Sequence, residues 1–150
     1  MLRISKETDY GIMVLGYLAT HPRGQIHTAR RIADWSGLSV PMVSKILRSL
    51  ARESIVASHR GASGGYSLEK PAHETSVAQV IRVLEGPISL VQCGSEPGVC
   101  ERERGCPTRV NWNRISLEVE QALERIPITE MLGRERAPLL SLGDSTAPAG

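Results

Sequence analysis

The sequence contains very few aromatic residues, which restricts how a core can be built. Phe is absent, and aromatic residues make up only 3% of the chain. Hydrophobic residues still reach 41%, so a core is expected from Leu, Ile, Val and Ala, which favours helices packed on helices. The 150 residues and their 23% charged content indicate one ordinary domain, or a small domain with an appended arm, rather than a disordered chain.

Long apolar segments are also missing. The longest run is about Ile12–Ala19, which is too short to span a bilayer. The first residues carry Glu7 and Asp9 where a signal peptide would have its apolar stretch. We therefore expect a soluble, cytoplasmic protein with no membrane partner.

A large charge excess of one sign is absent too, since the formal net charge is only +2. Its distribution is uneven, because residues 1–75 hold ten Lys and Arg against six Asp and Glu, and residues 76–150 hold eight against ten. A basic N-terminal half indicates a polyanionic partner.

The N-terminal half predicts a winged helix-turn-helix. Helical spacing of apolar residues predicts helices over about 5–20, 28–35 and 40–53, and the short, Gly-containing link between the last two is typical of a helix-turn-helix. Two β-prone runs, 55–60 and 66–68, flank a Gly-rich tip and indicate a hairpin, which in this position is a wing.

The C-terminal half predicts two more helices and a loop. Ser76 caps a helix over 77–85, a loop over 88–107 follows, and a long helix covers about 108–125. Apolar residues on this last helix step by three and four, which suits pairing with another helix: Trp112, Ile115, Val119, Ala122 and Ile126.

The expected fold class is therefore mainly α, a winged helix-turn-helix with a small β-hairpin wing and a long C-terminal dimerisation helix. The expected division is a DNA-binding domain over 1–72, a loop with a dimerisation helix over 73–133, and a disordered tail over 134–150.

The third predicted helix has two different faces. Val43, Ile46, Leu47 and Leu50 form an apolar face that would seat the helix, while the opposite face is polar and cationic, as entry into a DNA major groove requires. Residues near its start would lie closest to base edges, and Arg48 and Arg52 would meet phosphates. The predicted DNA-binding residues are Thr28, Ser39, Pro41, Met42, Ser44, Lys45, Arg48, Arg52, Arg60, Gly61 and Gly64.

The wing contributes Arg60, because a narrow minor groove attracts an inserted Arg and the neighbouring glycines allow a close backbone approach. A cationic stripe alone is usually only a solvated helix face, and a Gly-rich run alone is often a plain hairpin tip. The run lacks the Gly-Lys-Ser/Thr ending of a phosphate loop, which argues against nucleotide binding. The ordered combination of helix-turn-helix, cationic face and wing favours DNA.

Three cysteines, Cys93, Cys100 and Cys106, lie in the predicted loop. An odd, clustered set argues against a disulfide framework and for a metal or redox site. The spacings are too wide for a zinc ribbon and do not match a ferredoxin. Nearby Arg102, Arg104 and Arg109 would favour thiolates. Three thiolates leave a tetrahedral ion one ligand short, so a fourth ligand is needed. The alternatives for the role of these cysteines are a structural zinc site, a disulfide or inert thiols.

Several segments of the chain are distinctive when taken together. They are the three cysteines before the last long predicted helix and residues 2–5, 8–10, 60–66, 76–77 and 84–87. With these segments the chain resembles the iron–sulfur-cluster-sensing winged-helix transcription factors of bacteria, of the IscR and NsrR type, and it looks closest to regulators of the Suf cluster-assembly system of proteobacteria. The resemblance covers about residues 1–132.

This resemblance implies a homodimer with crossed C-terminal helices that binds a pseudo-palindromic operator in double-stranded DNA. It implies an iron–sulfur cluster, [2Fe–2S] or [4Fe–4S], on Cys93, Cys100, Cys106 and a fourth ligand. One branch uses a His three residues after the last cysteine, but Arg109 stands there. In the nitric-oxide-sensing branch an acidic residue near the N-terminus ligates the cluster of the partner subunit, and Asp9 matches this residue.

Two further residues, Glu7 and His27, are additional candidates for the fourth ligand. Asp9 itself could instead be only an exposed acid favoured by the helix dipole.

An enzyme is the contrasting hypothesis, and the sequence gives it little support. The four His are scattered, and no nucleophile motif is present. The remaining alternatives are a winged-helix repressor with a structural zinc or redox thiol site, and a nitric-oxide-responsive regulator.

Overall fold

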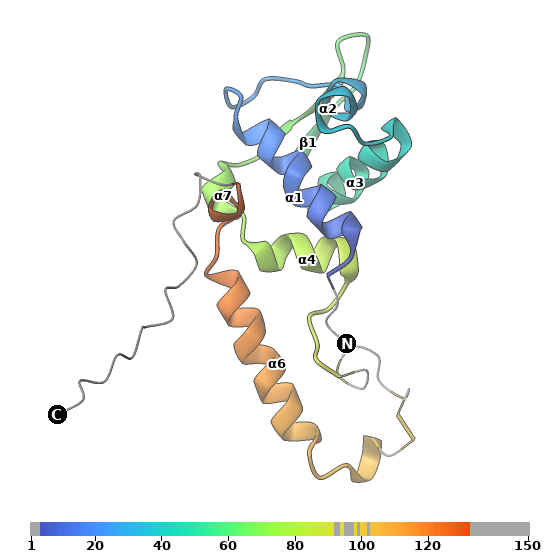
Figure 1. Ribbon diagram of the computed structural model, residues 1–150, viewed down its shortest axis with the longest axis vertical. Helices are drawn as coiled ribbons and strands as arrows, with labels where there is room; N and C mark the ends of the chain where they lie inside the picture. Colours follow the sequence, from blue (N-terminus) through green and yellow to red (C-terminus); the bar gives the residue numbers. More distant parts are fainter. Residues whose placement is uncertain (1–3, 92–93, 95–97, 99, 102, 133–150) are drawn as a thin grey trace, which may run out of the picture.

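The computed structural model describes residues 4–91, 94, 98, 100–101 and 103–132. The N-terminal segments form a body at the top of Figure 1, α4 lies below it, and α6 extends away from α4. The mainly helical winged helix-turn-helix predicted from the sequence is confirmed. The elements are α1 (Lys6–Ala19), α2 (Ala29–Ser36), α3 (Val40–Arg52), β1 (Val56–His59), β2 (Gly65–Leu68), η1 (Ala72–Glu74), α4 (Val77–Glu85), η2 (Glu103–Gly105), α6 (Arg109–Glu124) and α7 (Ile128–Met131).

Helix α1 is the centre of the body. It contacts α2, α3, α4, α7 and β2, so apolar residues on several of its sides are buried, among them Val14, Leu15 and Leu18. Ser5 begins the helix, because its hydroxyl accepts a hydrogen bond from the Glu7 N–H at 3.2 Å. A helix this apolar is stable only when neighbours cover it on more than one side.

Local sequence signals fix the helix-turn-helix. Thr28 and Ser39 cap α2 and α3 by accepting hydrogen bonds from the N–H groups of Arg31 and Met42. Between the helices, Gly37 has a φ of 70°, a left-handed conformation that glycine adopts without steric cost. This turn lets the buried faces of both helices meet the same core.

The wing is an antiparallel pair in which Val56 lies opposite Leu68 and His59 opposite Gly65. Its base is tied to the body by a bridge in which the backbone groups of His27 and Tyr66 exchange hydrogen bonds of 2.9 and 2.8 Å. A Cβ at Gly65 would lie 2.5 Å from the His27 carbonyl oxygen. Glycine is therefore required where the wing meets this segment.

Helix α4 connects the body to α6. Ser76 and Gln79 form a capping box at its start, and a small apolar cluster of Val77, Ala78, Ile81 and Ile88 packs against Leu123 and Ile126. Its Arg82 side chain donates to Glu120 at 2.6 Å and to Glu124 at 3.0 Å.

The chain then returns to the body through α7, where Ile128 is fully buried in the main core. The sequence did not predict α7 or the two 3-10 turns, because elements of three or four residues show no clear periodicity. The predicted tail lies outside the described residues, and the boundary at residue 72 stays a prediction. Within the described part of the chain, no helix is both long and apolar enough to cross a bilayer.

Leu47→Ala tests the core directly. Leu47 is fully buried in the main core, so the substitution should lower the free energy of unfolding by about 2–5 kcal/mol through lost burial and a residual cavity. Urea denaturation measures this change. Val40→Ala is the control, because Val40 on the same helix is 41% exposed, and its effect should stay near about 0.5 kcal/mol. Equal effects of the two substitutions would contradict the packing.

Candidate functional site

The polar face of α3 and the wing form a groove on the surface. Its lining comes from α3 and from both strands of the wing: Lys45, Arg48, Ser49, Ala51, Arg52, Ser58 and Tyr66. On the other side of α3, the residues expected in the core, Val43, Ile46, Leu47 and Leu50, are all fully buried. Burial of that face leaves Lys45, Arg48 and Arg52 exposed in the groove.

The other predicted α2 and α3 residues lie at or near the same surface. Thr28, Ser39 and Pro41 are exposed, whereas Met42 and Ser44 are half-buried. Met42 packs against the main core, so less of it faces outward than the sequence suggests. Sequence reasoning missed Ser49, which is one turn after Lys45 and accepts a hydrogen bond from Arg52 at 3.2 Å.

The wing tip presents Arg60 and Gly61 to solvent. Gly61 has a φ of 104°, and a Cβ at Gly64 would lie 2.5 Å from the His59 carbonyl oxygen. Glycine is thus needed for the tight tip itself, as well as for any close approach to DNA.

An ion pair that the sequence did not reveal lies beside the groove. Lys45 Nζ donates to Glu7 Oε2 at 2.7 Å, which joins α3 to the first turn of α1. Glu7 was a candidate cluster ligand, and in this structure its carboxylate pairs with the cationic face instead.

His27, another candidate ligand, lies in the core at 1% exposure. Its Nδ1 is 3.1 Å from the Tyr17 hydroxyl, its ring centroid is 4.4 Å from that of His21, and its buried Nε2 has no protein hydrogen-bond partner among the described residues. Burial, and then the charges of His21 and Arg31, lower the pKa of His27. This side chain stabilises the junction between α1 and the wing rather than reaching toward the cysteine loop.

Two of the three cysteines belong to the described residues, while Cys93 lies outside them. Cys100 and Cys106 are half-buried free thiols. Cys106 Sγ is 3.4 Å from the Thr108 hydroxyl, and hydrogen bonding to Thr108, with a smaller contribution from Arg109, lowers the pKa of the Cys106 thiol. A thiol that ionises readily fits a metal or cluster ligand.

The start of the cysteine loop is held along α6. The Leu90 N–H donates to the Ser116 hydroxyl at 3.1 Å. A Cβ at Gly94, the residue after Cys93, would lie 3.3 Å from Asn113 Oδ1, and Asn113 is one turn past Arg109. Chain segments next to Cys93 and Cys106 therefore both lie near the first turns of α6. Among the described residues, no group of three His, Cys, Asp or Glu is placed to hold a metal ion.

Asp9 is exposed on α1, where it borders an apolar hollow with Met13, Gly16, Trp35 and Leu132. Figure 1 shows that α6 begins at the end remote from the body that contains α1. Asp9 and the segment that precedes α6 thus lie in different parts of one protomer. An Asp9 ligand would have to come from a partner subunit.

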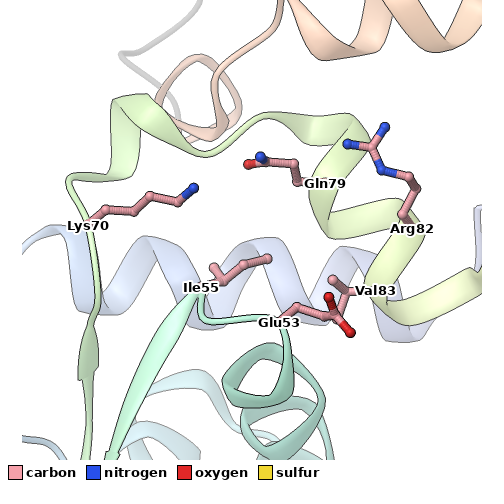
Figure 2. Close-up of a pocket in the computed structure, with 6 residues that line it drawn as sticks. All are labelled: Glu53, Ile55, Lys70, Gln79, Arg82 and Val83. Atoms are coloured by element: carbon pink, nitrogen blue, oxygen red, sulfur yellow. The ribbon is translucent and has the colours of Figure 1, made fainter.

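A second hollow lies between α4 and the turn from α3 to β1 (Figure 2). Its lining is Glu53, Ile55, Lys70, Gln79, Arg82 and Val83. The Lys70 and Gln79 side chains point toward one another across it, while Arg82 is bound to the carboxylates of α6. This lining includes no Ser, Cys or His side chain. Helix α4, which borders the hollow, contacts both α3 and α6.

The outer half of α6 carries uncovered apolar side chains. Val110 is 78% exposed and Leu117 51% exposed, and the predicted seam residues Trp112 and Ile115 are 43% and 40% exposed. Ile126, at the other end of the predicted seam, packs against α4 of its own chain. Ala122 is also exposed and Val119 is half-buried, so only Ile126 of the predicted seam is taken up by packing against α4.

Comparison with known proteins places these features in one family. A family model described as Rrf2, iron-dependent transcriptional regulator, matches residues 4–134. Solved structures with similar folds include CymR, the global cysteine regulator of B. subtilis, which is 29% identical with a TM-score of 0.65 over 88% of this chain and 97% of that chain.

T. potens IscR is 28% identical with a TM-score of 0.62, over 87% of this chain and 86% of that chain. The oxidized form of Staphylococcus aureus CymR is 27% identical with a TM-score of 0.62, and the match covers 91% of this chain and 100% of that chain. The matching family model describes transcriptional regulators, so the sequence-based prediction of a regulator rather than an enzyme is confirmed.

Acid should destabilise the junction between α1 and the wing. Because the folded-state pKa of His27 is lowered, the unfolded chain binds more protons once the pH falls below about 6.5. The free energy of unfolding should therefore decrease as the pH falls from about 7 toward the folded-state pKa, by up to about 1.4 kcal/mol per pH unit. Urea unfolding at several pH values in this range gives the slope of the free energy of unfolding against pH. This slope should be flatter for His27→Phe than for the wild type, and it should be unchanged for His73→Phe, because His73 is exposed. Equal slopes for His27→Phe and the wild type would contradict the assignment.

Proposed function

Because the chain belongs to the Rrf2 family of transcriptional regulators, we propose that it is a cytoplasmic homodimer whose affinity for a pseudo-palindromic operator depends on an iron–sulfur cluster, [2Fe–2S] or [4Fe–4S]. Its targets would include genes for iron–sulfur-cluster assembly. The observation that carries the proposal is the exposed cationic groove between α3 and the wing. The chain also carries three cysteines in the loop that precedes α6.

The groove supplies the contacts that DNA binding needs. Arg48 and Arg52 extend from the outward face of α3 and would neutralise phosphates, which fixes the position of the protein on the duplex. Lys45 and Ser44 lie closer to the start of the helix, the end that approaches base edges in helix-turn-helix proteins. Arg60 at the exposed wing tip would enter the neighbouring minor groove.

A second copy of the chain would supply the dimer. Trp112 and Ile115 are exposed on one side of α6, and exposed apolar side chains at helical spacing favour pairing with another helix. Val110 and Leu117 are also exposed, but they lie on the opposite side of α6 and would not join the same contact. Two α6 helices that cross there would hold two α3 helices at a fixed separation, as a two-fold operator requires.

The donor set suits an iron–sulfur cluster. Cys93, Cys100 and Cys106 would be the thiolate ligands, and Arg109 favours the ionised form of Cys106. Asp9 of the partner subunit would complete the set. When bound, the cluster would make the order of the loop depend on iron–sulfur supply or on oxidants such as oxygen and nitric oxide.

A second candidate function keeps the DNA binding but replaces the cluster by a redox-active thiol or a structural zinc. The likeness to B. subtilis CymR, described as a global cysteine regulator, and to the oxidized form of Staphylococcus aureus CymR favours the redox-active thiol. The two candidates share the α3 groove and differ in what the cysteines hold.

Substitutions in the groove test DNA binding. Arg48→Ala and Arg52→Ala should each weaken binding of duplex DNA at all sequences and reduce the slope of log K against log salt concentration by about one, because each removes one phosphate contact. Fluorescence anisotropy over a salt series gives both quantities. Arg125→Ala, at the end of α6 and away from the groove, is the charge-matched control. Unchanged slopes in both groove variants would show that α3 does not face DNA.

Anaerobic purification tests the cluster. The wild type should contain iron and acid-labile sulfide with visible charge-transfer absorbance, and Cys106→Ser should lose them while keeping the wild-type circular dichroism. Operator affinity should then stop responding to iron–sulfur loading. Colourless protein with one zinc per chain would favour the zinc alternative. Protein with neither metal nor sulfide would contradict the cluster.

A further inference from the structure

The ion pair between Lys45 and Glu7 joins the DNA-facing side of α3 to the first turn of α1. Lys45 Nζ lies 2.7 Å from Glu7 Oε2, and the side chains are 59% and 23% exposed, respectively. Lys45 also lines the groove with Arg48 and Arg52. One of the three groove cations is thus already paired within the protein before any DNA is present.

Glu7 is the fixed member of this pair. Its backbone N–H is bound to the Ser5 hydroxyl at 3.2 Å, and the Glu85 carboxylate of α4 accepts hydrogen bonds from the Ser5 N–H at 2.8 Å and from the Thr8 hydroxyl. Burial opposes ionisation of Glu85, but these hydrogen bonds outweigh it and lower its pKa. The first turn of α1 is therefore anchored, and the flexible Lys45 side chain reaches toward it.

A carboxylate at this place acts against DNA in two ways. It competes with phosphate or base oxygens for the Lys45 ammonium group, and its own charge repels the polyanion. An intramolecular pair must be broken before Lys45 can contact DNA. Among the described residues, Arg48 forms no ion pair with a carboxylate, and Arg52 is hydrogen-bonded to the neutral Ser49.

We propose that Glu7 is a positioning residue that restrains Lys45 in the free protein and sets the affinity and salt dependence of DNA binding. This inference rests on the proposed function, because it requires α3 to face DNA. In the wild type, the pair with Glu7 holds Lys45 back from phosphate. While it is held there, Lys45 neutralises no phosphate and adds nothing to the release of counterions from the duplex.

Glu7→Gln should release this restraint. The affinity for a duplex of unselected sequence should rise by about 1.5-fold to 5-fold at low salt, which corresponds to loss of one surface ion pair. The slope of log K against log salt should become steeper by about 0.9, because Lys45 now releases a counterion of the duplex. Anisotropy titrations of the full-length protein with a labelled duplex, repeated over a salt series, measure both effects.

The matched variants separate the pair from a general charge effect. Glu130→Gln removes the same charge from the exposed side of α7 and should leave the slope unchanged. In a Lys45→Gln background, Glu7→Gln should no longer change the slope. Similar circular dichroism spectra and thermal midpoints would show that all variants fold.

Two results would overturn the inference. One is a Glu7→Gln variant with wild-type affinity and slope, and the other is an equal gain from Glu7→Gln in the wild-type and Lys45→Gln backgrounds. The proposed function fails on a different result, namely unchanged slopes in Arg48→Ala and Arg52→Ala. The two failures are therefore distinguishable in one set of titrations.

Discussion

Burial of the apolar side of α3 is the constraint on which the candidate DNA-binding surface depends. Val43, Ile46, Leu47 and Leu50 are fully buried against a core centred on α1, and together they fix the rotation of α3 about its own axis. Because side chains on a helix are distributed at about 100° per residue, this rotation turns Lys45, Arg48 and Arg52 outward. The wing is then placed beside them by the bridge from Tyr66 to His27, which also contacts α1 through Tyr17. One core therefore positions every part of the groove.

The same helix α1 connects the groove to the rest of the chain. Its first turn holds Glu7 against α3 and is itself held by Glu85 at the end of α4. Residue 86 then begins the path to the cysteine loop, and Arg82 on α4 binds two carboxylates of α6. A rearrangement of α6 would thus act first on α4, which packs directly against both α1 and α3.

The sequence predicted most of the fold because its signals are local. Ser5, Ser39 and Ser76 begin helices as expected, since their hydroxyls accept hydrogen bonds from N–H groups of the first turn, and the α3 core face follows directly from helical spacing. It could not predict the Lys45–Glu7 pair, whose members are 38 residues apart and meet only after α1 and α3 pack. It also missed α7, whose place is fixed by burial of Ile128 in the core and not by any periodicity of its own.

The ligand set suggested by the sequence places a geometric demand on the assembly. Cys106 lies three residues before the first residue of α6, whose start is remote from the body, whereas Asp9 lies on α1 within that body. A single protomer therefore keeps Cys106 and Asp9 apart, and Trp112 and Ile115 in the outer half of α6 stay exposed. A partner whose α6 crosses this seam would satisfy both needs, since it would cover the apolar residues and bring one chain's α1 toward the other chain's loop. In the proposed dimer, dimerisation and completion of the proposed ligand set would be the same event. A change at the cysteines would then alter the spacing of two α3 helices rather than the fold of either one.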